Sequence, residues 1–72
     1  MATEVISPTA GLVVQVSAAE GQTVSAGETV VTLQSMKTEI AITADVSGRV
    51  SKVLVKKGDE VAVGQTLVEI ES

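Results

Sequence analysis

The chain contains an internal repeat that restricts the folds it can adopt. Displacing the 72-residue sequence by 37 positions lays residues 11–35 on residues 48–72 without a gap, and 9 of the 25 superposed pairs are identical. The identical pairs are Gly11 and Gly48, Val13 and Val50, Val16 and Val53, Gly21 and Gly58, Val24 and Val61, Gly27 and Gly64, Thr29 and Thr66, Val31 and Val68, and Ser35 and Ser72. Turn glycines and core positions are what a repeated backbone would keep. We therefore expect two similar halves that interlock, because neither can bury its own apolar face.

Each half has the composition and pattern of β-strands. Val, Ile and Thr supply 26 of the 72 residues, and no segment of useful length shows a 3.6-residue apolar period. Strands are predicted at 4–6, 12–18, 23–24, 29–34 and 39–43, with a bulge near Val14 and Gln15 and tight turns at Gly21 and Gly27. The prediction is one all-β domain over 1–72: a flattened barrel or sandwich of two facing four-stranded antiparallel sheets with pseudo-two-fold symmetry.

The composition also narrows the function. The chain has no Cys, His, Phe, Tyr or Trp, and its net charge is −4. Nucleic acid is an unexpected partner, because cationic and stacking side chains are scarce or missing. No nucleophile has an evident activating base, so we expect a non-catalytic protein. No continuous apolar run predicts a membrane span or signal peptide, and together with the absence of Cys this favours a cytoplasmic location.

Lys37 occupies a special place in this pattern. It lies between the strands predicted at 29–34 and 39–43, so it should form the tip of a hairpin. The matching end of the second half is the end of the chain, so one pole should present Lys37 and the other the two termini. Most exposed lysines are simply solvated, and that reading fits Lys52, Lys56 and Lys57. The position of Lys37 instead predicts an attachment point.

These residues resemble the biotinyl/lipoyl attachment domain family, and within it the biotin carboxyl carrier proteins. The resemblance covers almost the whole chain, and its core is Ser35-Met36-Lys37, which is similar to the Ala/Ser-Met-Lys of the biotin attachment motif. The motif usually reads Glu-Ala-Met-Lys-Met, and here Gln34, Ser35 and Thr38 replace the Glu, the Ala and the second Met. The other residues that carry the resemblance are Ser7-Pro8, Gly11, Gly21, Val24, Gly27, Gly48, Gly58-Asp59, Val61 and Gly64-Gln65.

The resemblance implies that biotin is joined by an amide to the side-chain amine of Lys37, with Ser35, Met36 and Thr38 as neighbours in the attachment site. Met36 is expected to contact the ligase or the biotin arm, although methionine is also a common gap-filler. The implied partners are a biotin protein ligase, a biotin carboxylase, and a carboxyltransferase or decarboxylase subunit. Two alternatives stay open: a lipoyl carrier of a 2-oxo-acid dehydrogenase or glycine-cleavage system, and an unmodified interaction module.

Overall fold

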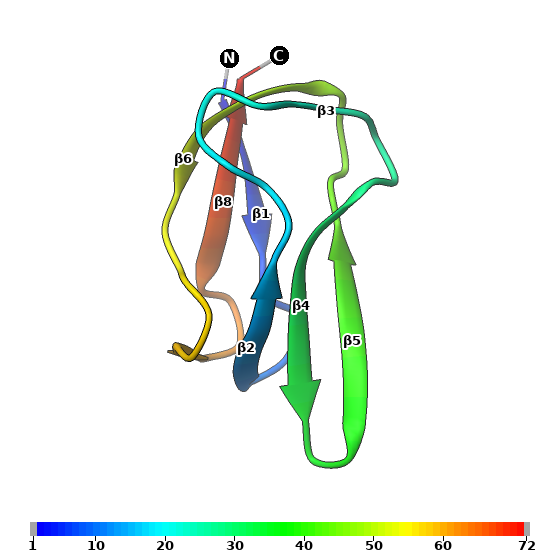
Figure 1. Ribbon diagram of the computed structural model, residues 1–72, viewed down its shortest axis with the longest axis vertical. Coiled ribbons are helices and arrows are strands. Elements are labelled where there is room, and N and C mark those ends of the chain that lie inside the picture. Colours follow the sequence, from blue (N-terminus) through cyan, green and yellow to red (C-terminus); the bar gives the residue numbers. More distant parts are fainter. Residues whose placement is uncertain (1, 72) are drawn as a thin grey trace.

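The computed structural model describes residues 2–71 and is all-β over that range (Figure 1). Its strands are β1 (Ala2–Ile6), β2 (Gly11–Val16), β3 (Thr23–Val24), β4 (Thr29–Ser35), β5 (Thr38–Thr43), β6 (Gly48–Val53), β7 (Glu60–Val61) and β8 (Thr66–Glu71). Within these residues there is no helix long and apolar enough to cross a membrane. The sequence prediction of a helix-free domain is confirmed.

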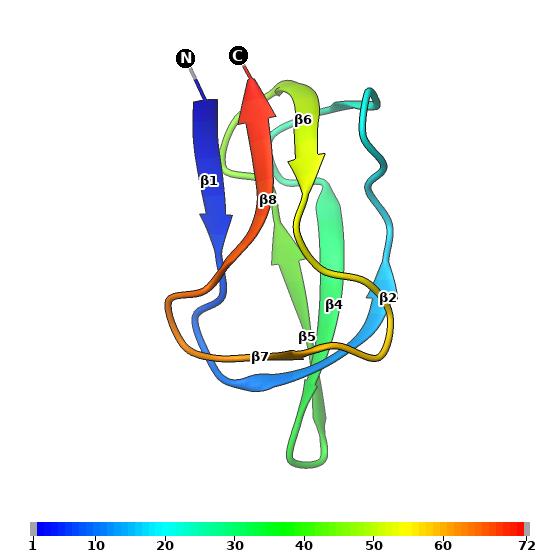
Figure 2. The same cartoon turned by 90° about the vertical axis from the view of Figure 1, so that its left-hand side faces the viewer.

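The strands form two four-stranded sheets that exchange elements between the halves of the chain. One sheet has the order β1-β8-β6-β3 and the other β5-β4-β2-β7, and all pairings are antiparallel. Replacing each strand by the one four places later or earlier converts the first order into the second. The two sheets are therefore related by the predicted pseudo-two-fold, and each contains two strands from either half. Figure 2 shows the sheet of β1, β8 and β6 in front of β4 and β5.

Reciprocal turn contacts join the halves. The backbone N–H of Gly21 donates to the Val50 carbonyl at 2.8 Å, and that of Gly58 donates to the Val13 carbonyl at the same distance. Both glycines have positive φ, 86° at Gly21 and 97° at Gly58, which other residues rarely adopt. The turns predicted from the repeated glycines are confirmed.

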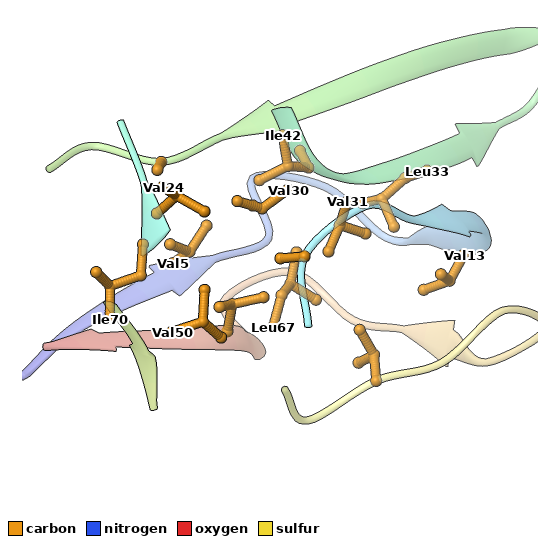
Figure 3. Packing of buried hydrophobic residues seen from close by; sticks show 14 of the residues in the cluster. Val5, Val13, Val24, Val30, Val31, Leu33, Ile42, Val50, Leu67 and Ile70 are labelled. Atoms are coloured by element: carbon orange, nitrogen blue, oxygen red, sulfur yellow. The ribbon is translucent and has the colours of Figure 1, made fainter. Parts of the chain in front are cut away.

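The buried residues of the core repeat with the same spacing of 37 positions. The buried residues of the described chain form eight pairs at this spacing: Val5 and Ile42, Ser7 and Ala44, Val13 and Val50, Ala18 and Val55, Val24 and Val61, Val30 and Leu67, Val31 and Val68, and Leu33 and Ile70. Figure 3 shows the aliphatic side chains meeting between the two layers. The only polar member is Ser7, whose hydroxyl donates to the Thr9 carbonyl. Aliphatic burial is the main stabilising term available to a fold of this kind.

Strand β2 ends earlier than predicted, and it contains the predicted bulge. The strand was expected to run to residue 18, but it ends at Val16. The N–H groups of Ser17 and Ala18 both donate to the Val30 carbonyl, at 2.8 and 3.2 Å, so the regular ladder stops there. The register between β2 and β4 shifts between Val13 and Gln15, which confirms the predicted bulge. The other predicted strands of the first half and 39–43 differ from the structure by at most two residues at an end.

The two ends of the molecule differ as expected. The described structure measures 33 × 17 × 17 Å, and the hairpin between β4 and β5 lies at one end of the long axis. β1 begins and β8 ends at the opposite end, where Ala2 pairs with Glu71 (Figure 1). Ser72, which the repeat matches with Ser35, lies outside the described residues. Among residues 2–71, the β4–β5 hairpin is the feature that breaks the two-fold symmetry.

Candidate functional site

The hairpin of β4 and β5 projects beyond the strands beside it. Its last cross-strand pair is Ser35 with Thr38, which leaves Met36 and Lys37 as a two-residue tip. On the other side of β4, the pairing with β2 reaches only to Gln34, opposite Leu12. Figure 1 shows the tip extending past the end of β2. Lys37 is thus presented on a narrow arm, and its predicted place at a hairpin tip is confirmed.

Exposure alone does not single out Lys37. Lys52, Lys56 and Lys57 are exposed as well. Lys52 lies within β6, and the Lys56 N–H donates to the Asp59 carboxylate at 3.0 Å across a turn. Lys57 follows in that turn, next to the positive-φ Gly58. What distinguishes Lys37 from these lysines is its position at the end of a projecting two-strand arm.

The backbone of Met36 is unusual. Its φ is 57°, and it is the one non-glycine residue with positive φ in the part of the chain that the structure describes. In a two-residue hairpin, both primed turn types have a positive φ at the first central position, and because Lys37 is not among the positive-φ residues, the turn is of type II′, which normally has glycine there. The side chain is 94% exposed, so the alternative that Met36 fills a gap in the core is wrong. A large apolar side chain is therefore held in solvent beside Lys37, on a backbone better suited to glycine.

Ser35 and Thr38 form the base of the tip. They face each other across the hairpin, with Ser35 half-buried and Thr38 exposed. The structure thus brings together all four residues predicted for the attachment site. Their register is fixed by the β4–β5 ladder, because a slip of one residue would turn every side chain of the arm to the opposite face.

An open groove of about 440 Å³ begins at the tip and runs over the ends of β4, β2 and β7. Its lining consists of Ala10, Gly11, Leu12, Gln34, Ser35, Met36, Glu60 and Val61. Leu12 and Glu60, which come from distant parts of the chain, were not predicted from the sequence. The repeat differs at both positions, since Leu12 is superposed on Arg49 and Glu60 on Thr23, but most pairs of the repeat differ and nothing in the sequence sets these two apart.

The chemistry open to this site is that of a primary amine on a long stem. A lysine amine can be acylated, and its flexible four-carbon stem suits a tether. The tip gives a modifying enzyme access to Lys37 from several sides, and neighbouring strands hold the arm in place. These features fit a carboxylic-acid cofactor joined by an amide. Over residues 2–71 no three His, Cys, Asp or Glu side chains are gathered so that they could hold a metal ion.

Known carboxylases are similar to this chain in sequence and in structure. Over 67 residues the chain is 42% identical to the biotin-dependent acyl-coenzyme A carboxylase alpha3 subunit of Mycobacterium leprae, covering 93% of this chain and 11% of that protein. The urea carboxylase structure from Kluyveromyces lactis superposes with a TM-score of 0.92 at 37% identity, covering 99% of this chain and 6% of that one. The chain therefore corresponds to a small part of both carboxylases.

A third similarity concerns the fold alone. The lipoyl domain of the 2-oxoglutarate dehydrogenase complex from Azotobacter vinelandii superposes with a TM-score of 0.74 at 22% identity, covering 89% of this chain and 81% of that domain. The family model described as "Biotin-requiring enzyme" matches residues 3–70, nearly the whole chain. Given this match and the lysine hairpin that the fold presents, the chain belongs to the biotin/lipoyl family of biotin-requiring enzymes.

Proposed function

We propose that residues 1–72 form the biotin carrier domain of a biotin-dependent carboxylase, with biotin joined by an amide to Nζ of Lys37. The observation that carries this proposal is the projecting hairpin tip, where Lys37 follows Met36 at the end of the β4–β5 ladder. The similarity to the acyl-coenzyme A and urea carboxylases supports the same assignment. The two relatives are named for different acceptors, an acyl-coenzyme A and urea, so what they share with this proposal is the biotin carrier.

The role of the protein is transport. When attached, biotin supplies a ring nitrogen that accepts and releases a carboxyl group. Lys37 contributes the flexible part of the tether, and the β4–β5 arm holds the start of that tether away from the body of the domain. A short tether raises the effective concentration of the cofactor at each site it can reach. Lys37 acts as an attachment point in this scheme, and no residue of the domain is assigned an acid or base role.

The neighbours of Lys37 serve recognition. Met36 presents its exposed thioether side chain to the biotin ligase or to the biotin arm. Ser35 and Thr38 close the base of the tip and fix the direction in which the lysine leaves the arm. The proposed partners are a biotin protein ligase, a biotin carboxylase, and a carboxyltransferase or decarboxylase subunit. The cytoplasmic location stays a prediction from the sequence.

A lipoyl carrier is the second candidate, because lipoyl domains share this fold. Two observations favour biotin. The carboxylases are 37% and 42% identical to this chain, whereas the lipoyl domain is 22% identical. In addition, lipoyl domains typically have Asp immediately before the modified lysine, and this chain has Met36 there.

Intact-mass measurement after expression in a host with both biotin and lipoate ligases tests this function. We expect one biotin per chain, and Lys37→Arg should abolish it without changing the melting temperature, because the side chain is exposed at the tip. Lys57→Arg is the matched control, since Lys57 is also an exposed turn lysine beside a positive-φ residue. Attachment of lipoate, or biotin mapped by peptide mass to Lys57, would contradict the assignment.

A further inference from the structure

The large exposed apolar residues that have a counterpart in the other half are not matched by a large apolar residue there. Among the described residues, the large exposed apolar ones are Ile6, Leu12, Met36, Leu54 and Val63. The 37-residue spacing places Thr43 opposite Ile6, Arg49 opposite Leu12, Ser17 opposite Leu54 and Ala26 opposite Val63. The buried residues, in contrast, all pair with buried residues. The fold therefore accepts small or polar residues at these exposed positions, so packing of the domain does not require the apolar side chains there.

Leu12 and Met36 meet at the same groove. Leu12 is 40% exposed and Met36 is 94% exposed, and both line the 440 Å³ hollow beside the hairpin tip. The backbone pair formed by Leu12 and Gln34 corresponds to the pair formed by Arg49 and Glu71 at the opposite end of the molecule. The fold therefore accommodates two charged residues, Arg49 and Glu71, at the matching cross-strand pair. At the lysine end the same backbone carries an apolar and an uncharged residue.

We propose that this groove is a resting site for the biotin ring attached to Lys37. The proposal rests on the function proposed above and adds a second, non-covalent contact between the cofactor and its own carrier. The occupant is specified by continuity, because the groove begins at Met36, the residue next to Lys37. The tether of a ring on that lysine therefore starts beside the groove.

The lining matches the chemistry of the biotin ring system. The thioether side of the ring is apolar and suits Leu12 and Met36, because sulfur and methylene groups pack well against aliphatic and thioether side chains. The ureido side has N–H donors and a carbonyl acceptor. Glu60 offers a carboxylate acceptor, and Gln34 offers an amide that can donate and accept. Small ligands are typically bound by this combination of apolar walls and a few polar groups.

A weak site is sufficient for this purpose. A short flexible tether gives an effective concentration in the millimolar range, so a groove with a dissociation constant of about 1 mM is occupied roughly half of the time. An open groove with few polar partners fits such an affinity. Occupancy at that level shields the ring from solvent between visits to an active site but still releases it readily.

Nuclear magnetic resonance of the apo and biotinylated domain tests the proposal directly. On a sample whose mass confirms one biotin, we expect amide shift changes at Gly11, Gln34 and Val61 as well as at the tip, and nuclear Overhauser contacts from biotin ring protons to the Leu12 methyl groups. Lys37→Gln removes the lysine charge without adding a ring, so it shows which shifts reflect charge alone. Changes confined to 36–38, without ring contacts to Leu12, would overturn the proposal while leaving the carrier function intact.

A matched pair of variants separates the groove from general surface effects. Leu12→Arg introduces the residue that the repeat already accommodates at position 49. It should reduce the amide shift change that biotinylation causes at Val61 by at least half. Leu54→Ser introduces the residue found at the matching position 17, and it should leave them unchanged, although Leu54 is 42% exposed and therefore comparable to Leu12. Equal shift changes in both variants would refute the resting site. The contacts in the parent domain decide the question if Leu12→Arg does not fold.

Discussion

Met36 combines a strained backbone with a solvent-exposed apolar side chain. A non-glycine residue at positive φ costs on the order of 1–2 kcal/mol, because its Cβ approaches the neighbouring carbonyl oxygen. Burial cannot offset this cost at Met36, whose side chain is 94% exposed. Sites that keep a locally unfavourable residue are often functional sites. The same residue lines the groove that we assign to biotin, which gives the side chain a role at the tip.

Replacing Met36 separates the backbone effect from the side-chain effect. Met36→Gly should leave the free energy of unfolding equal or raise it by up to about 1 kcal/mol, since relief of strain outweighs the added entropy of the unfolded glycine. Met36→Ala keeps the strain and should leave stability unchanged. Both variants should be biotinylated more slowly by purified ligase, which mass spectrometry over time would show. A parent-like rate in both variants would mean that the ligase does not use this side chain.

At the level of elements, the β4–β5 hairpin gives Lys37 its direction. The six cross-strand pairs between Thr29–Thr43 and Ser35–Thr38 fix the register, with one irregularity near Val31. Beyond Gln34 the arm has no support from β2, so the last pair and the tight turn alone set the orientation of the tip. A ligase that recognises this arrangement reads a shape as well as a sequence.

Inserting one glycine between Ser35 and Met36 tests that idea. The insertion keeps Met36-Lys37-Thr38 contiguous but lengthens the turn, and its loop-entropy cost is well under about 1 kcal/mol, so the domain should fold. We expect strongly reduced biotin attachment, measured by mass after a fixed time with ligase. A glycine inserted between Asp45 and Val46, in the loop before β6, should leave attachment unchanged. Biotinylation of the tip insertion at the parental rate would show that local sequence is the signal.

The repeat explains why much of this arrangement could be predicted, and also what could not be. Matching glycines marked the turns at Gly21 and Gly58, because few other residues tolerate their φ. The hairpin around Lys37 followed from two strands flanking a short polar segment. The positive φ of Met36 could not be predicted from the sequence, because residues 35–38 contain no glycine that would mark such a turn. The groove could not be predicted, because Leu12 and Glu60 meet only through the pairing of β2 with β7.

For the whole molecule, the repeated strands of the two halves form the two sheets, and the unrepeated β4–β5 hairpin carries the site. The two halves contribute equivalent strands, turns and buried side chains, and over residues 2–71 only the link between them forms a closed hairpin. Gly48 illustrates how closely β6 and β8 approach each other within the second half, because a Cβ at this position would collide with the Glu71 carbonyl oxygen. Neither half has a complete sheet of its own, since four of the six strand pairings join β1–β4 to β5–β8.

This interlocking predicts that the halves cannot fold separately. Alone, residues 1–36 keep only the β2–β4 pairing and residues 37–72 only the β6–β8 pairing, and two-stranded ribbons are marginal in water. Each half would also expose its members of the eight buried pairs, and chains below about 40 residues without a disulfide or metal rarely form a stable core. We therefore expect narrow amide dispersion in the spectrum of either peptide, against a dispersed spectrum and one cooperative transition for the intact chain. A dispersed spectrum from one half by itself would mean that it buries its own core, and the pseudo-two-fold would then join two independent units instead of creating the single body that holds Lys37.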